Sequence, residues 1–213
     1  MKKKKIALIA TSVALIGVLV AGITMAYFTD KDENLNVITM GNVNIDLDET
    51  GAEDRENTTH GKDYENVSPN EPIEKDPTVT IQPGSEDAYI RVSLEFIGDM
   101  FTLEGKEADL KAAIDMAVNT DDWYYSSADG YYYYQGILSN KESGITEATL
   151  FEGFTIPDSW GNEIADKTFQ IRVTAEAIQA DHFTPARDAN GVITGWADSQ
   201  GQPITAETYT PQP

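Results

Sequence analysis

The residues that could bind a divalent cation are few, and the clearest group follows a predicted strand. Asp46-Leu47-Asp48-Glu49-Thr50-Gly51 matches the first half of an EF-hand loop, with oxygen-bearing side chains at positions 1, 3 and 5 and glycine at position 6. Position 12 is Asn57, which cannot supply the bidentate carboxylate that closes such a loop. We therefore interpret the segment as an acidic exit from a strand, with calcium binding by Asp46 and Asp48 as the alternative.

The residue pattern gives little support for an enzyme. A catalytic zinc takes about three protein ligands, commonly two histidines at helical spacing with a glutamate as base. The chain has two histidines, His60 and His182, and neither lies in an H-E-x-x-H motif. It has no cysteine, which excludes disulfides and thiolate catalysis, and it contains no Gly-x-Ser-x-Gly sequence. We expect no catalytic residue, no cofactor and no bound metal, with a zinc site shared between histidine and carboxylates as the alternative.

Two aromatic runs, Trp123–Tyr125 and Tyr131–Tyr134, flank a five-residue loop that contains Asp-Gly. This arrangement predicts a β-hairpin. Its rings could form a platform on which sugars stack, or they could pack across the strands and stabilise the hairpin. The candidate platform residues are Trp123, Tyr125, Tyr132 and Tyr134.

The elements that must position these residues are mostly strands. Apolar and polar residues alternate with period 2 along several segments, and turn residues separate them, which is typical of strands in an antiparallel sheet. One segment, 106–118, changes to the period of an amphipathic helix. The pattern predicts a mainly β fold, an antiparallel β-sandwich with one short helical insertion. The predicted strands cover residues 36–48, 77–82, 88–97, 123–125, 131–134, 148–156 and 167–179, with a small hairpin about 188–191.

The phase of the alternation predicts which side chains face the core. On the strand over 36–48, Val43, Ile45 and Leu47 share one face, and Gly41 marks a kink or bulge. The two longest strands give the clearest phase. Their inward residues are predicted to be Ile90, Val92, Leu94 and Phe96, and Phe169, Ile171, Val173, Ala175 and Ala177.

The first residues have the pattern of an export signal. Four lysines, Lys2–Lys5, precede an apolar run of 18 residues, Ile6–Ile23, and small residues Thr24 and Ala26 follow. We predict cleavage between Ala26 and Tyr27. The apolar run is at the lower length limit for crossing a bilayer, so an uncleaved transmembrane helix is the alternative. In both cases the rest of the chain lies outside the cytoplasm, because the lysines stay inside.

Composition and charge separate the chain into predicted parts and argue against nucleic acid and anionic lipid as partners. The 213 residues carry a net charge of −21, and removal of the four signal lysines would leave 11 basic residues against 36 acidic ones, a net charge of −25. Such a surface repels nucleic acid and anionic lipid, so the membrane is a partner only through the signal segment before cleavage. The predicted parts are the signal peptide 1–26, an N-terminal strand segment 27–48, an acidic flexible loop 49–74, the β-sandwich core 75–180 and a polar C-terminal hairpin and tail 181–213.

Three stretches taken together resemble the TasA/camelysin family of Gram-positive bacteria, which is exported through a signal peptidase of the SipW type. They are Ala26–Asp30 followed by Val37–Val43, Lys75–Val79 with Gly84–Val92, and Trp160–Asn162 leading to Val173–Ala180. The resemblance implies a jelly-roll β-sandwich and a secreted protein of the cell surface or extracellular matrix. It also implies that some members polymerise into biofilm fibres, in which the mature N-terminal segment completes the sheet of a neighbouring subunit. Part of the family is described as zinc metalloendopeptidases.

From these observations we expect a secreted structural protein, a fibre subunit whose partners are itself or paralogous subunits. The alternatives are a camelysin-like metal-dependent surface endopeptidase and a monomeric carbohydrate-binding or adhesive module. A freed N-terminal strand can add to an exposed sheet edge, but it can also pair within its own sandwich, and the residues leave both possibilities open. The candidate assembly residues are Val37, Ile38, Val43, Ile45 and Leu47.

Overall fold

The computed structural model describes residues 31–32, 36–40, 43–49, 64–65, 68–197 and 202–204. All of them fall in the second of two units into which the chain divides, Lys31–Pro213. The signal segment with Thr24, Ala26 and Tyr27 lies outside the described residues, as do Gly41 and His60. Among the helices that are described, none has the length and apolar composition needed to cross a membrane.

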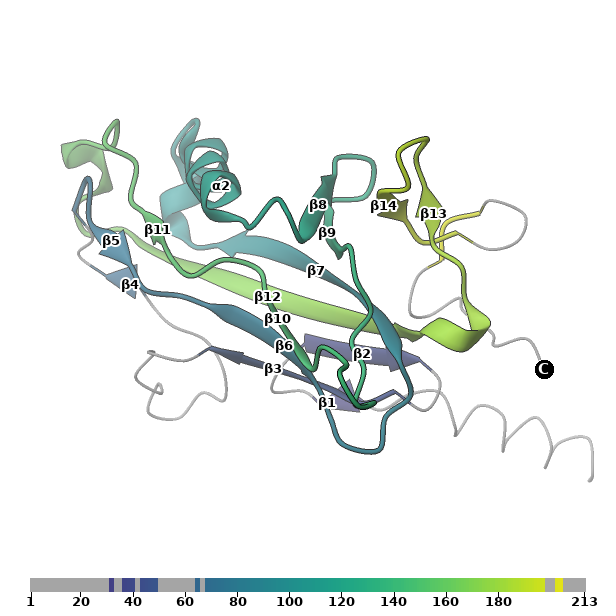
Figure 1. The fold of residues 1–213 in the computed structure, drawn as a ribbon. Helices are drawn as coiled ribbons and strands as arrows, with labels where there is room; N and C mark the ends of the chain where they lie inside the picture. Colours follow the sequence, from purple (N-terminus) through teal and green to yellow (C-terminus); the bar gives the residue numbers. More distant parts are fainter. Residues whose placement is uncertain are drawn as a thin grey trace, which may run out of the picture. The chain divides into compact units, whose positions relative to one another are not determined.

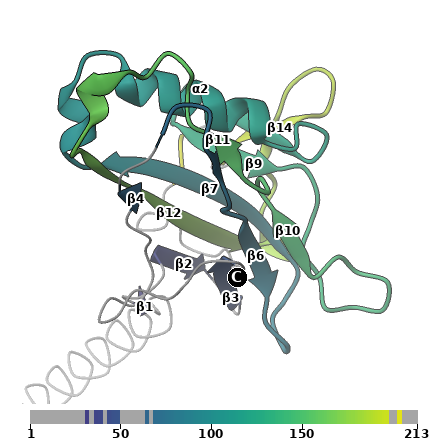
Figure 2. The same ribbon diagram turned by 90° about the vertical axis from the view of Figure 1, so that its left-hand side faces the viewer.

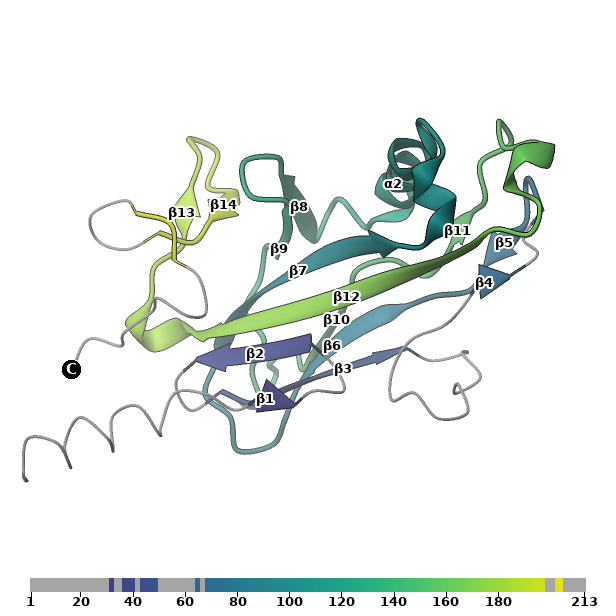
Figure 3. The same cartoon turned by 180° about the vertical axis from the view of Figure 1, so that it is seen from behind.

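Two long neighbouring strands form the centre of the structure (Figures 1 and 3). β7 (Ala88–Ile97) and β12 (Thr168–Gln179) pair antiparallel along a ladder that runs from Ile97↔Gln170 to Ala88↔Gln179. Both strands were predicted from period-2 alternation, and their bounds agree with the prediction to within one residue. All five inward residues predicted on β12 are buried. On β7, Ile90 and Val92 are buried, whereas Leu94 and Phe96 pack against the core half-buried.

Shorter strands extend this pair into a seven-stranded sheet and build a second, smaller sheet. The large sheet has the order β1 (Lys31–Asp32), β2 (Asn36–Met40), β12, β7, β9 (Tyr131–Tyr134) and β8 (Trp123–Ser126), and β4 (Tyr64–Glu65) also pairs with β12. The second sheet has the order β10 (Glu147–Thr149), β6 (Pro77–Ile81) and β3 (Ile45–Glu49). The protein is therefore mainly β with mostly antiparallel pairing, as the sequence predicted.

Two small ladders and a few helices complete the described residues. β5 (Pro72–Ile73) pairs with β11 (Phe154–Thr155), and β13 (Ala186–Arg187) pairs with β14 (Ile193–Gly195). The α-helix, α2 (Lys106–Ala117), contacts β11 and lies above β7 in Figure 2. Three short 3₁₀ turns cover η1 (Asp99–Thr102), η2 (Asn162–Ile164) and η3 (Ala180–His182).

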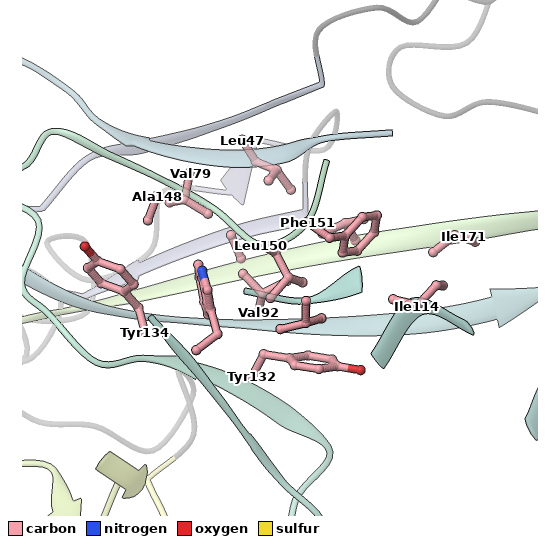
Figure 4. Close-up of a cluster of buried hydrophobic side chains, with 14 of the residues drawn as sticks. Leu47, Val79, Val92, Ile114, Tyr132, Tyr134, Ala148, Leu150, Phe151 and Ile171 are labelled. Atoms are coloured by element: carbon pink, nitrogen blue, oxygen red, sulfur yellow. The ribbon is translucent and has the colours of Figure 1, made fainter. Parts of the chain in front are cut away.

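The main hydrophobic core brings side chains of both sheets and of α2 together (Figure 4). Leu47 of β3 and Val79 of β6 come from the small sheet, and Val92 of β7 comes from the large one. Ile114, on the helix stripe that the sequence predicted, is fully buried in the same cluster. Burial of so much apolar surface is the main source of stability in a chain without disulfides.

Two predicted strands are each divided in the structure, which corrects their bounds. The segment 36–48 forms β2 in the large sheet and β3 in the small one. The segment 148–156 forms β10 and β11, which belong to different ladders and are separated by buried Leu150 and Phe151. The predicted alternation of Val43, Ile45 and Leu47 is confirmed by their burial, but periodicity along one strand carries no signal for a passage between two sheets.

The segment 49–74 was predicted as a flexible loop, and this is wrong for two parts of it. β4 pairs with the start of β12, and β5 pairs with β11 and buries Ile73. Both strands have two residues, which is too short for an alternation signal to be visible among acidic neighbours. The aromatic hairpin and the turn at residues 188–191 were predicted correctly.

The different burial of two phenylalanines gives the first prediction. Phe169 is fully buried, so Phe169→Ala should lower the free energy of unfolding by about 3–5 kcal/mol. Phe96 is half-buried against the same core, so Phe96→Ala should cost only about 1–2 kcal/mol. Urea unfolding followed by tryptophan fluorescence measures both values. Equal losses would contradict the burial seen at the two positions.

Candidate functional site

The outer edge of β12, on the side away from β7, is the feature of the fold that is best suited to a partner strand. Two separate short segments cover this edge within the chain. β2 pairs with Thr174–Ile178, and β4 pairs with Thr168 and Phe169. Both segments come from the N-terminal 65 residues. A sheet edge covered by short segments of this kind is a template for strand addition when a segment leaves.

The pairing of β2 with β12 differs from the other ladders between described strands because it is parallel. Asn36 pairs with Thr174, Ile38 with Glu176, and Met40 with Ile178. Parallel pairing is slightly less stable per residue than antiparallel pairing, and it requires no hairpin to the partner strand. β2 is therefore held on β12 by a short parallel ladder rather than by a tight local connection.

The candidate assembly residues divide between the two sheets, contrary to the prediction of one assembly strand. Val37 and Ile38 lie in β2, on the edge of β12. Val43, Ile45 and Leu47 are buried in the main core, because β3 pairs antiparallel with β6 of the same chain. Substitution of Val43 or Ile45 would therefore damage the fold of the subunit itself, so only β2 remains a candidate for exchange.

The aromatic hairpin packs into the core, which was one of the two possibilities, and does not form the alternative stacking platform. Trp123, Tyr132 and Tyr134 are buried, and Tyr125 packs half-buried against Tyr132 with ring centroids 4.8 Å apart. The indole Nε1 of Trp123 donates a hydrogen bond to the carbonyl oxygen of Thr149, 2.9 Å away. These rings stabilise the hairpin and the core, so they cannot stack on a sugar from solvent. Tyr124 is the ring of this hairpin that is exposed.

A charged pair is buried on the second face of the large sheet, opposite the main core. Arg91 of β7 and Glu176 of β12 face each other in the ladder, and their exposed fractions are 2% and 5%. The Arg91 Nε donates to the Glu176 carboxylate at 2.8 Å and Nη2 donates to the same oxygen at 2.5 Å. Tyr131 Oη donates to the other carboxylate oxygen at 2.9 Å. Every charge of the pair is thus hydrogen-bonded, which a buried ion pair requires.

Aromatic rings enclose the guanidinium group. Its carbon lies 3.9 Å from the ring centroid of Tyr131 and 4.3 Å from that of Trp196. Arg91 Nη1 also donates to Tyr133 Oη at 3.2 Å, and Tyr133 donates to Asp129 at 2.6 Å. Burial lowers the pKa of Arg91, but the Glu176 carboxylate and Tyr133 together outweigh burial and raise this pKa. The arginine is therefore a permanent charge that rigidly links β7, β12 and the hairpin.

The tyrosines of this network give a pH prediction. Burial, together with the charge of Glu176, raises the pKa of Tyr131 to about 12, and burial also raises the pKa of Tyr133. The folded state holds these protons more tightly than the unfolded chain, so their contribution to stability is complete below about pH 10, the ordinary tyrosine pKa, and declines above it. We expect thermal stability to fall as pH rises from about 10 to 12. Ultraviolet difference absorbance should show late ionisation that is lost in Tyr131→Phe.

A second network links α2 to the hairpin. Lys111 Nζ contacts both carboxylate oxygens of Asp115 at 2.8 and 2.7 Å and donates to Tyr132 Oη at 3.1 Å. The same ammonium lies 3.7 Å from the ring centroid of Tyr125. Tyr132 also donates to Asp115. Burial and this carboxylate raise the pKa of Tyr132, so the phenol stays neutral and acts as a structural donor.

The metal candidates are not brought together by the described structure. Asp46 and Asp48 lie on the exposed face of β3, and His182 belongs to η3. Among the described residues, no group of three or more histidine or acidic side chains is placed to hold a metal ion.

Comparisons with protein-family models, with curated proteins and with solved structures found no match for this chain.

Sequence reasoning missed the Arg91–Glu176 pair. Both residues were assigned to the polar, outward faces of the two best-predicted strands, and their charges are opposite. The register of β7 on β12 places them opposite each other, and the rings of Tyr131 and Trp196 cover the guanidinium group. The cluster of aromatic residues after position 182 was the one available signal, because Phe183 and Trp196 are unusual in a segment otherwise read as a polar tail.

Proposed function

We propose that this protein is an exported structural subunit that polymerises into a fibre of the cell surface or biofilm matrix by β-strand addition. The observation that carries the proposal is the parallel pairing of β2, close to the predicted mature N-terminus, with the outer edge of β12. In the fibre, β2 of one subunit would occupy this edge on the next. The partners are copies of this chain or paralogous subunits, and a signal peptidase of the SipW type would free the N-terminus at Tyr27. A jelly-roll connectivity, as in the TasA/camelysin family, is part of this proposal.

The division of the N-terminal segment between two sheets supports the exchange of β2 alone. β3 is anchored by its ladder with β6 and by the buried side chains of Val43, Ile45 and Leu47. β2 is held by its ladder with β12, and four residues separate its end from the start of β3. If β2 leaves and β3 stays, the subunit keeps its main core. Exchange between identical chains replaces each lost ladder by an equivalent one, which is why swapping is a low-cost route to assembly.

Charge would control the rate of such assembly. Mature subunits with a net charge of −25 repel one another at neutral pH and low ionic strength. At 0.1 M salt the Debye length is about 10 Å, so charges farther apart than this repel one another only weakly. Lower pH also reduces the repulsion, because it protonates carboxylates. Fibre growth should therefore be faster under both conditions, whereas an assembly driven by attraction between opposite charges would slow in salt.

A reversible covalent lock tests the proposal. The chain has no cysteine, so a double variant, Val37→Cys with Ala175→Cys, introduces a single engineered disulfide between residues that pair in the parallel ladder. We expect the reduced mature protein to form fibres in electron micrographs and the oxidised protein to stay monomeric. A variant with Val37→Cys alone controls for the substitution. Equal fibre formation by the oxidised and reduced double variants, or no fibres from the parent at any ionic strength, would overturn the proposal.

A further inference from the structure

The C-terminal residues form a separate cover over the second face of the large sheet. We define the C-terminal cap as residues 183–197 and 202–204. Its buried apolar side chains form a cluster with Tyr133 and Ile178 that is distinct from the main core. Trp196 lies at the centre, with ring centroids 5.9 Å from Phe183 and 6.1 Å from Tyr133. Ile204 closes the cluster, and its backbone N–H donates to the Trp196 carbonyl at 3.0 Å.

Gln135, the residue after β9, hydrogen-bonds the cap. The side-chain amide of Gln135 makes the two hydrogen bonds to Ile193 that the backbone of a neighbouring strand would make. Its Nε2 donates to the Ile193 carbonyl at 3.1 Å, and its Oε1 accepts from the Ile193 N–H at 2.7 Å. The Trp196 Nε1–H is buried and has no acceptor within the described structure. An unsatisfied buried donor opposes burial, because it has lost its bond to water. The unsatisfied donor therefore destabilises the packed position of the cap at Trp196, the residue that covers Arg91.

The cap and the outer edge of β12 meet at Glu176 and Ile178, which pair with β2 and lie under the cap. The Glu176 side chain accepts from Arg91 and Tyr131 beneath Trp196, while the Glu176 position is the middle of the ladder that β12 makes with β2, opposite Ile38. With the cap seated, water is excluded from the ion pair, and the pair holds β12 and β7 in register. With the cap lifted, water can hydrate both charges, and the pair constrains β12 less strongly.

We propose that the C-terminal cap sets how tightly β12 holds its parallel strand, so that lifting the cap releases β2. Trp196 is the positioning residue in this coupling, acting through Arg91 and Glu176. Since the coupling is a property of one subunit, it can be measured without fibres. Its use as a control on assembly rests on the proposed function, in which release of β2 is the step that opens the acceptor edge.

Amide hydrogen exchange of the monomeric mature protein, kept at low ionic strength, tests the coupling. Trp196→Ala removes the ring from Arg91 and should reduce protection of the amides in β2 by about tenfold or more. Trp196→Phe keeps an aromatic ring and removes the unsatisfied donor, so protection of β2 should stay within about twofold of the parent or increase. Ile114→Val, on the buried face of α2 in the main core, is the control for general destabilisation. It should leave the ratio of amide protection between β2 and β6 unchanged.

Two outcomes would overturn the inference. One is unchanged protection of β2 in Trp196→Ala while the amides of β14 exchange faster, because the cap would then open without affecting β12. The other is an equal loss of protection in β2 and β6, which would make Trp196 an ordinary contributor to global stability. Fibre assays stay separate. If Trp196→Ala releases β2 but the parent forms no fibres, the coupling holds and the proposed function fails.

Discussion

Mature protein that lacks residues 27–40 should remain folded and soluble but form no fibres. The deletion removes β1 and β2 and leaves β3, whose buried side chains hold it in the main core. The truncated subunit therefore keeps its main core but has no strand to donate. Circular dichroism and size-exclusion chromatography report the fold, and electron microscopy reports assembly. An unfolded truncated protein would show that β2 is an obligatory internal strand.

Addition of a peptide distinguishes a missing donor from a damaged subunit. A synthetic peptide of residues 27–42 should bind the truncated protein and raise its melting temperature, because ligands that bind only the folded state stabilise it. A peptide of the same composition in scrambled order is the matched control. It can still form main-chain hydrogen bonds with the edge, but its side chains do not have the native alternation. Equal stabilisation by both peptides would contradict a specific acceptor edge on β12.

Arg91→Ala should lower the free energy of unfolding by about 3–5 kcal/mol, because it leaves the Glu176 carboxylate buried without its partner. The chain contains a matched control in the same ladder. Arg172 of β12 and Glu95 of β7 form a second cross-strand pair at 2.5 Å, but their side chains are 50% and 61% exposed. Arg172→Ala should therefore cost about 1 kcal/mol or less. Urea unfolding of the two variants gives the comparison.

A double variant sharpens this test. Arg91→Met with Glu176→Met removes both charges and keeps apolar volume, so it should recover a large part of the stability lost by Arg91→Ala. Recovery would show that the loss comes from the unpaired carboxylate and not from packing. If Arg91→Ala and Arg172→Ala cost the same, the pair is not buried in solution, and the position of the C-terminal cap over it would be wrong.

The sequence was most informative where one strand can be judged alone. Alternation placed β7 and β12 within one residue of their bounds and predicted the buried face of β12, since side-chain period follows directly from strand geometry. It could not show that residues 36–48 belong to two sheets, because the partner of a strand is decided by contacts distant in sequence. The same limit explains why β4 and β5 were taken as loop.

The candidate site was only partly predictable for a related reason. A donor strand within residues 27–48 was one of two possibilities, and burial of Val43, Ile45 and Leu47 against the chain's own β6 leaves β2 as its candidate. The aromatic residues of the hairpin were recognised, yet whether a ring faces solvent depends on what packs above it, which alternation cannot tell. Arg91 and Glu176 face each other only because of the register in which β7 pairs with β12, and that register cannot be read from either strand alone.

Donation of β2 to the edge of β12 on the next subunit has a consequence for the shape of the polymer. The donated strand and the edge that receives it are different surfaces, so successive subunits would join head to tail, without a two-fold axis between them. Such a filament is polar. One end presents a vacant edge and the other a free strand, so growth and capping can differ at the two ends. An excess of the 27–42 peptide would then block only the end with the vacant edge, and a tagged truncated subunit would mark only the opposite end.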